Sequence, residues 1–191
     1  MTCIYEPEED SFLLKEAVEN FLEKNASEDM KILEIGTGSG IIIKSVRNLI
    51  QKKGVKAKLY ATDINKNVVK TKCDGINFLL SDLFSSIKGN FDLIIFNPPY
   101  LPESKNDRYL DNNIKKSVVG GKKGYETTLK FLDALSGHLK KNGTCLLLIS
   151  SLTGKEVVEK KLRENFKWRV IKERPLFFEK LYVYMVRIGI Q

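Results

Sequence analysis

The sequence contains few of the residues that build disulfide frameworks or metal sites. Its 191 residues include three cysteines and one histidine, His138. Cys3, Cys73 and Cys145 are about 70 residues apart, and no two of them form a CxxC pair. Small disulfide-rich domains and structural zinc sites need a denser set of these side chains. We therefore expect an intracellular protein that holds no metal ion.

Signals for insertion into or export across a membrane are also missing. The sequence has no run of about 18 apolar residues, which a transmembrane helix requires. Its acidic N-terminus does not show the basic and then apolar pattern of a signal peptide. Hydrophobic residues make up 42% of the chain, which is enough for a packed core. We expect one cytoplasmic domain over residues 1–191, which begins with an arm and a helix at residues 1–29.

Arginine is scarce in a sequence that is otherwise basic. Of the 32 basic residues 26 are lysine, and the formal net charge is +8. Residues 1–95 contain 13 basic and 14 acidic side chains, whereas residues 96–191 contain 19 and 10. Lysine is less suited than arginine to bidentate recognition of bases and phosphates. A solvated lysine-rich surface and a partner that carries nucleic acid are both compatible with this pattern.

Short apolar runs alternate with helical periodicity along the chain, which predicts a doubly wound α/β fold with a mostly parallel sheet. Strands are predicted at residues 31–35, 58–62, 76–80, 91–96 and 144–150. Helices are predicted at residues 11–25, with Ser11 as N-cap, and at 41–50, 65–72, 125–140 and 155–166. Two further strands, 168–174 and 181–188, have no helix between them and should pair as an antiparallel hairpin. Residues 101–123 are predicted to be irregular and to contact the substrate.

A glycine-rich turn, Glu34-Ile35-Gly36-Thr37-Gly38-Ser39-Gly40, follows the first predicted strand. Ligands of open α/β sheets bind beyond the carboxyl ends of the strands, and glycines let the backbone approach them closely. A dinucleotide fingerprint would have its third glycine where this chain has Ile41. The carboxylate of Glu34 would repel a pyrophosphate but suits a ligand with an amino group and a sulfonium. A tight turn that binds no ligand remains an alternative from this motif alone.

Acidic residues follow the next two predicted strands. Asp63 can accept hydrogen bonds from both hydroxyls of a ribose, as an acid at this position does in nucleotide-binding folds. Ser81-Asp82-Leu83 stands at the end of the third strand, where it could meet an adenine. Helix capping would also account for either aspartate. The glycine turn and the two acids together predict one ligand that contains adenosine.

The tetrapeptide Asn97-Pro98-Pro99-Tyr100 directly follows the apolar run LIIF at residues 93–96. The prolines fix their own backbone and keep Asn97 extended. The side-chain oxygen of Asn97 and the main-chain oxygen of Pro98 could then accept both hydrogens of one planar NH2 group. Tyr100 could lie against a flat substrate. These residues, with Pro99, predict a site that holds an amino group for reaction.

Taken together, these motifs resemble those of class I S-adenosylmethionine-dependent methyltransferases that act on NH2 groups. The segment YEPEEDSFLL at residues 5–14 resembles the opening of archaeal and eukaryotic HemK-type release-factor glutamine methyltransferases. GGKKG at residues 120–124 is similar to a glycine-rich segment of that group. Bacterial members have an additional N-terminal domain that this sequence lacks, so we expect the archaeal and eukaryotic branch.

The resemblance implies a Rossmann-like sheet of seven strands in the order 3-2-1-4-5-7-6, with the last strand antiparallel. It implies S-adenosylmethionine as cofactor and, as substrate, the glutamine of the Gly-Gly-Gln loop in a class-1 translation release factor. A small zinc-binding activator subunit is expected to pair with an edge of the sheet. The implied cofactor-binding residues are Ser11, Glu34, Gly36, Thr37, Gly38, Asp63, Ile64, Asp82, Leu83 and Asn97.

Two other functions remain open from the sequence. An adenine-N6 or guanine-N2 methyltransferase of nucleic acid could use the same tetrapeptide, with Tyr100 stacked on a flipped base. The basic second half of the chain keeps this alternative open, although no residues remain for a separate recognition domain. A scaffold that binds the cofactor without catalysis is the other possibility. We assign no catalytic role to His138, which we place in the helix predicted at 125–140.

Overall fold

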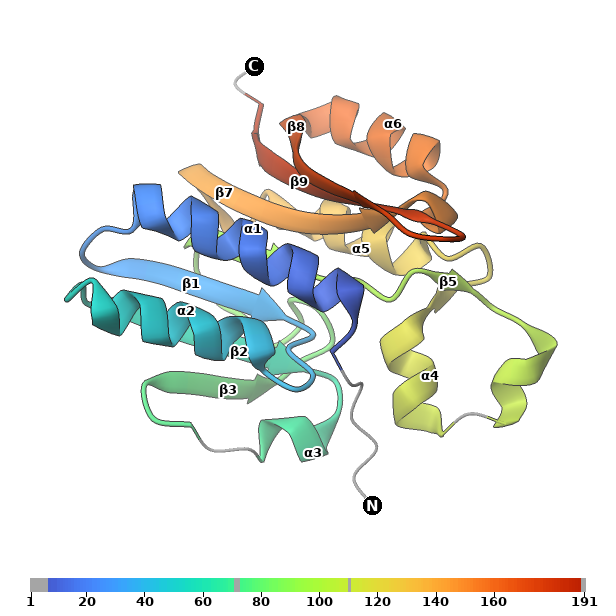
Figure 1. Ribbon diagram of the computed structural model, residues 1–191, viewed down its shortest axis with the longest axis horizontal. Coiled ribbons are helices and arrows are strands. Elements are labelled where there is room, and N and C mark those ends of the chain that lie inside the picture. The colour runs from blue at the N-terminus through green and yellow to red at the C-terminus, as the bar shows by residue number, and fades with distance from the viewer. Residues whose placement is uncertain (1–6, 71–72, 110, 190–191) are drawn as a thin grey trace.

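Seven strands form one sheet in the order β3-β2-β1-β4-β7-β9-β8 (Figure 1). The computed structural model describes residues 7–70, 73–109 and 111–189. Strands β1 to β4 and β7 pair in parallel, and β9 is antiparallel to both of its neighbours. This confirms the implied strand order and the C-terminal hairpin. The strands are β1 (Met30–Ile35), β2 (Ala57–Asp63), β3 (Ile76–Leu80), β4 (Phe91–Phe96), β7 (Leu139–Ser150), β8 (Phe166–Pro175) and β9 (Lys180–Ile188).

Helices cover both faces of the sheet because its strands are apolar on both sides. On β1, Ile32 packs into one hydrophobic cluster with the helices α1 and α2, whereas Leu33 and Ile35 pack into a second cluster with α5 and α6. Figure 1 shows α1 and α2 together in front of the sheet. The helices are α1 (Glu9–Asn25), α2 (Ile41–Lys52), α3 (Lys66–Val69), α5 (Glu126–Leu135) and α6 (Lys155–Asn165).

The segment predicted to be irregular, residues 101–123, contains secondary structure, so that prediction was wrong. It includes β5 (Leu101–Pro102), the 3-10 helix η1 (Lys105–Tyr109), α4 (Asn112–Val118) and β6 (Val119–Gly121). Strands β5 and β6 pair in parallel as a separate two-stranded sheet, and α4 lies beside the main sheet in Figure 1. Strands this short carry no periodic signal in the sequence, because only their pairing defines them.

Two predicted helix boundaries were also wrong. Helix α1 begins at Glu9, so Ser11 lies inside its first turn and is not the N-cap. The helix predicted to reach residue 140 ends at Leu135, and Leu139 belongs to β7. Leu139 pairs with Phe91 of β4, an interaction distant in sequence that helical periodicity does not reveal. His138 therefore lies in a turn, where its ring stacks on Phe84 with centroids 4.4 Å apart.

Other local features agree with the sequence. The side chain of Asn65 accepts a hydrogen bond from the backbone of Asn67 and caps α3, as predicted. A second 3-10 helix, η2 (Ser151–Thr153), connects β7 to α6. The predicted arm before residue 7, which includes Cys3, and the end of the predicted helix at residues 71–72 lie outside the described residues. In the described part of the chain, no helix is long and apolar enough to cross a membrane.

Candidate active site

The carboxyl ends of β1, β2 and β4 open onto a cavity of about 550 Å³. This volume is in the range that small-molecule sites occupy. Helix α1 packs against α2 and β7, and its first turn supplies the buried side chains Asp10 and Ser11 to the cavity. The structure brings together every residue that the sequence predicted for cofactor or substrate: Ser11, Glu34, Gly36, Thr37, Gly38, Asp63, Ile64, Asp82, Leu83, Asn97, Pro98, Pro99 and Tyr100.

The glycine-rich turn needs its glycines for its backbone conformation. Gly36, Gly38 and Gly40 have φ angles of 64°, 51° and 74°, in the left-handed region that favours glycine. The turn is fixed to the neighbouring strand β2, since the backbone N–H of Thr37 donates to the carbonyl of Thr62 at 2.9 Å. The backbone of the turn consequently lines the cavity.

Glu34 is a buried carboxyl group at the base of this turn. Its Oε2 accepts hydrogen bonds from Thr37 Oγ1 at 2.5 Å and from the backbone N–H of Ile43 at 3.2 Å. Burial nevertheless raises the pKa of Glu34 to about 8, and the nearby Asp63 acts in the same direction. A cationic group of a ligand would stabilise the ionised form, which is the chemistry the sequence suggested for this position.

Asp63 links the glycine turn to the loop after β2. One carboxylate oxygen accepts from the backbone N–H of Gly38 at 2.9 Å, and the other accepts from that of Asn65 at 2.8 Å. Burial raises its pKa despite these hydrogen bonds. Each oxygen has a second lone pair that a hydroxyl group can use. The position of Asp63 is therefore compatible with a ribose.

The end of β3 is shaped by Ser81. Its hydroxyl donates to the carbonyl of Leu83 at 2.9 Å and accepts from the backbone N–H of Ser86 at 3.0 Å. Leu83 has a φ angle of 47°, a rare conformation for this residue type. Asp82 is exposed at the cavity wall, and Ile64 adds an apolar side chain that is 44% exposed. This wall has the polar and apolar groups that an adenine ring needs.

Asn97 is held in one orientation by Asp10, a residue that our sequence predictions missed. Asn97 Nδ2 donates to Asp10 Oδ2 at 3.1 Å, and a carboxylate accepts but does not donate. The other amide atom, Asn97 Oδ1, is buried and has no hydrogen-bond partner among the described residues. Buried acceptors without partners are rare in native proteins. The only sequence signal for Asp10 was its place in a run of carboxylates before the first helix.

Tyr100 is a neutral phenol beside these acids. Burial raises its pKa above the usual value, and the negative charges of Asp10, Glu179 and Glu8 add to this effect. Glu8 and Glu179 also line the cavity and were missed from the sequence. The hydroxyl of Ser150 is hydrogen-bonded to Glu179, which fixes that side chain at the end of β7.

The glycine-rich segment at residues 120–124 packs against the backbone of the tetrapeptide. A Cβ atom on Gly120 would lie 2.4 Å from the carbonyl oxygen of Pro99. A Cβ atom on Gly124 would lie 2.4 Å from the carbonyl oxygen of Tyr100. Only glycine permits this approach, so the segment supports the conformation of the loop after β4.

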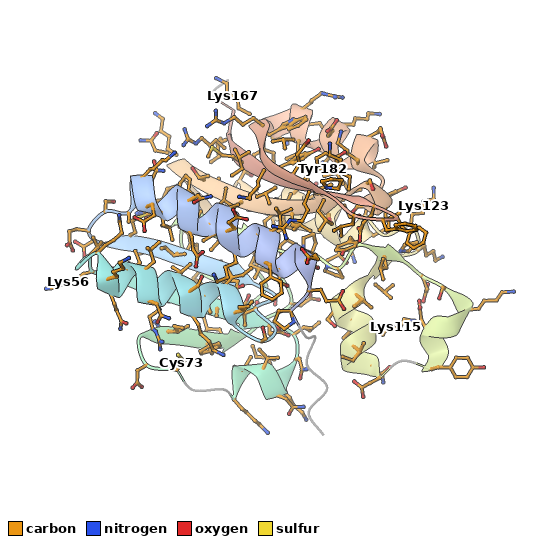
Figure 2. The ribbon with its side chains drawn as sticks, viewed as in Figure 1. Lys56, Cys73, Lys115, Lys123, Lys167 and Tyr182 are labelled. Carbon is orange, nitrogen blue, oxygen red and sulfur yellow. The ribbon has the colours of Figure 1, made fainter. Side chains whose placement is uncertain are left out.

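Three lysines of the second half lie apart from one another in Figure 2: Lys115 on α4, Lys123 after β6 and Lys167 on β8. Lys115 on α4 forms an ion pair of 2.9 Å with Glu103, which connects α4 to the segment after β5. This distribution is typical of a solvated basic surface.

Charges inside the cavity have the opposite sign. Its lining contains one lysine, Lys116, and the acidic side chains of Glu8, Asp10, Asp63, Asp82 and Glu179. It also contains Glu34, which its raised pKa keeps largely protonated near pH 7 in the ligand-free protein. Such a cavity attracts cationic or neutral groups and repels phosphates. Within the described residues, no group of three or more His, Cys, Asp and Glu side chains is placed to hold a metal ion.

Comparison with known proteins decides the family. A protein of Methanocaldococcus jannaschii, provisionally named a protein N5-glutamine methyltransferase, is 38% identical over 94% of this chain and 89% of its own length. The chain belongs to the protein N5-glutamine methyltransferase family. A family profile described as Eco57I restriction-modification methylase matches residues 10–174. That description names a restriction-modification enzyme, and the matched residues include the tetrapeptide Asn97-Pro98-Pro99-Tyr100.

Other relatives agree with membership of this family. The release factor glutamine methyltransferase of Aquifex aeolicus is 35% identical over 76% of this chain. This chain spans only about half of that protein's length, 55%. The Mtq2–Trm112 complex of E. cuniculi, whose description states that it methylates the eRF1 termination factor, matches with a TM-score of 0.74 and 28% identity. That match covers 97% of this chain and 99% of the other, which confirms the class I methyltransferase fold.

Proposed function

We propose that this enzyme transfers a methyl group, in the cytoplasm, to the side-chain nitrogen of the glutamine in the Gly-Gly-Gln loop of a class-1 translation release factor. The relatives named above include enzymes that act on release factors. The observation that carries the proposal is the buried Oδ1 of Asn97, which has no hydrogen-bond partner among the described residues. Asn97 lines the same cavity as the glycine-rich turn.

The cavity suits S-adenosylmethionine, the cofactor of this family. Glu34 is a buried carboxyl group with a raised pKa. The cationic amino group of the cofactor, bound next to Glu34, would lower that pKa and stabilise the ionised form. Asp63 would accept from the ribose hydroxyls, and the wall formed by Asp82, Leu83 and Ile64 would take the adenine. When bound, the cofactor supplies a methyl group that is already activated by the sulfonium.

The main task of the protein is to prepare a weak nucleophile. The lone pair of an amide nitrogen is delocalised into its carbonyl group. Asn97 Oδ1 and the carbonyl of Pro98 would each accept one hydrogen of the substrate NH2, which orients the nitrogen toward the methyl group. The new nitrogen–methyl bond would replace the methyl–sulfur bond, and the nitrogen would release one proton to solvent. In a buried site these dipoles act strongly and need no reorganisation. Asp10 is a positioning residue, because its hydrogen bond to Nδ2 turns Oδ1 toward the substrate.

The charge of the cavity favours a protein substrate over the nucleic-acid alternative. Besides the largely protonated Glu34, five acidic side chains and one lysine line it, and their net negative charge would repel the phosphates that flank a target base. A glutamine side chain is neutral and carries no such penalty.

We further propose that a small activator subunit, with a zinc site of its own, pairs with the outer edge of β3. This edge strand has the sequence INFLL, and Leu79 and Leu80 are 37% and 52% exposed. The other edge, β8, alternates charged residues such as Lys167 and Arg169, which protect an edge from pairing. An apolar, unprotected edge is typical of a strand that acquires a partner.

The decisive experiment is labelled methyl transfer followed by mass spectrometry. The enzyme, with and without a candidate activator, would be incubated with S-adenosylmethionine and a release factor, other proteins or RNA. We expect the label on the glutamine of the Gly-Gly-Gln motif, and no label when that glutamine is replaced by glutamate. Label on RNA alone, or on protein at other residue types, would contradict the proposal.

A further inference from the structure

The tip of the β8–β9 hairpin presents two fully solvated aromatic side chains. Phe177 and Phe178 are 92% and 86% exposed, and their rings pack edge to face with centroids 4.6 Å apart. They are the most exposed large hydrophobic residues in the described chain. Exposing both costs free energy, and a paired aromatic knob of this kind is typical of an interaction site.

The tip is anchored beside the cavity. The backbone N–H of Leu176 donates to the carbonyl of Glu179 at 2.7 Å, which closes the turn around the two phenylalanines. The backbone N–H of Lys180 donates to Ser151 Oγ at 2.9 Å. Glu179, the next residue after Phe178, lines the cavity and is hydrogen-bonded to Ser150. The aromatic pair is thus held in place one residue from the cavity wall.

Two further exposed apolar side chains lie on η2 and β5, the elements between this tip and the cavity. Leu152 of η2 is 44% exposed, and η2 contacts both β9 and β5. Leu101 of β5 is 38% exposed and lines the cavity. In Figure 1 the end of the hairpin lies beside β5. We call Leu101, Leu152, Phe177 and Phe178 the apolar ridge.

We propose that the apolar ridge docks the protein substrate, by contacting a surface of the folded substrate outside the Gly-Gly-Gln loop. This inference rests on the proposed function. One residue of the ridge, Leu101, lines the cavity that would receive the glutamine, and the acidic side chains of the cavity disfavour a nucleic acid there. The proposed activator edge, β3, is at the opposite side of the sheet from β8, so the ridge remains accessible in the complex. Docking on the ridge would let the enzyme distinguish its protein substrate from other proteins that expose a glutamine.

The test compares two substrates and three variants. The double variant F177S/F178S removes the aromatic pair, F177L/F178L keeps apolar character, and V157S changes an exposed valine of α6 (38% exposed) outside the ridge. Each would be assayed, with its activator, on intact release factor and on a short peptide that contains Gly-Gly-Gln. Calorimetry with S-adenosylmethionine would show whether the cavity is intact.

We expect F177S/F178S to lower kcat/KM for intact release factor at least about tenfold through KM, as removal of an interface hot spot does. Its activity on the peptide and its cofactor affinity should match those of the wild type and of V157S, and F177L/F178L should recover part of the loss. Equal loss on both substrates, no loss on either, loss of the activator, or a change in oligomeric state would overturn the proposal. Failure of the wild type to methylate either substrate would instead refute the proposed function.

Discussion

At the scale of single residues, the interaction of Asp10 with Asn97 makes a sharp prediction. In Asp10→Ala the amide of Asn97 is free to rotate, so a substrate hydrogen bond is lost in part of the molecules. One neutral hydrogen bond contributes about 1 kcal/mol, so we expect kcat to fall roughly five- to tenfold. Asp10→Asn should recover part of the rate, since an amide oxygen can accept from Nδ2.

Single-turnover rates and cofactor affinity separate this role from a structural one. Cofactor affinity should be unchanged in both Asp10 variants, because we expect Asp10 to act through its hydrogen bond to Asn97 of the tetrapeptide. If the two variants have equal rates, Asp10 does not act through the orientation of the amide.

Glu34 should make the free energy of unfolding of the ligand-free protein depend on pH. Its pKa rises from 4.5 to about 8 on folding, so the folded state binds the proton more tightly than the unfolded state. The stability that protonated Glu34 provides is therefore present below pH 4.5 and lost as the pH rises to about 8. Glu34→Gln cannot ionise, and we expect it to be more stable at pH 7 by up to about 3 kcal/mol while it binds the cofactor more weakly.

Denaturant unfolding of both ligand-free proteins between pH 5 and 8 would check this prediction. The free energy of unfolding should decrease with pH in the wild type more steeply than in the variant. Parallel curves for the two proteins would show that Glu34 does not titrate in this window.

At the scale of elements, the glycine-rich segment controls the loop that holds the substrate. In Gly120→Ala the new Cβ would be 2.2 Å from the carbonyl oxygen of Gly124 and 2.4 Å from that of Pro99. Both are backbone atoms, so the loop after β4 must move. We expect kcat/KM to fall about 100-fold or more, because small misplacements of reacting groups have costs of this size.

Gly137→Ala is the matched control, because its Cβ would lie 3.5 Å from the carbonyl oxygen of Ala134, which is an ordinary contact. Activity assays and thermal unfolding of both variants would test the prediction. An active Gly120→Ala enzyme would show that the segment does not constrain the loop.

Helices and strands with a clear apolar pattern in their own sequence were predictable. Strands such as β4 are apolar on both faces, and the ends of parallel strands share one edge, so the predicted site residues meet in the cavity. Elements that depend on distant pairing were not predictable. Leu139 continues a helical pattern in sequence but pairs with Phe91 in the fold, and β5 exists only because β6 lies beside it. Asp10 was missed because its partner, Asn97, is 87 residues away.

At the scale of the whole molecule, the two edges of the sheet should behave differently. Leu79→Ser with Leu80→Ser makes the β3 edge polar and should reduce co-purification of the activator, because the exposed leucines lose their apolar contact. Val170 on β8 is 38% exposed, close to the 37% of Leu79. Val170→Ser should leave co-purification of the activator unchanged. If the activator no longer binds the β8 variant but still binds the β3 variant, the activator pairs with β8 and not with β3.

The central claim is that Asn97 holds the amide nitrogen of the substrate. Single-turnover methyl transfer to release factor by Asn97→Ala, with cofactor affinity measured in parallel, tests it most directly. We predict that transfer falls about 100-fold or more, as when one preorganised hydrogen-bonding group is removed from an active site, while the Kd for S-adenosylmethionine stays within about tenfold. Transfer near the wild-type rate, or loss that follows only from weaker cofactor binding, would contradict the account.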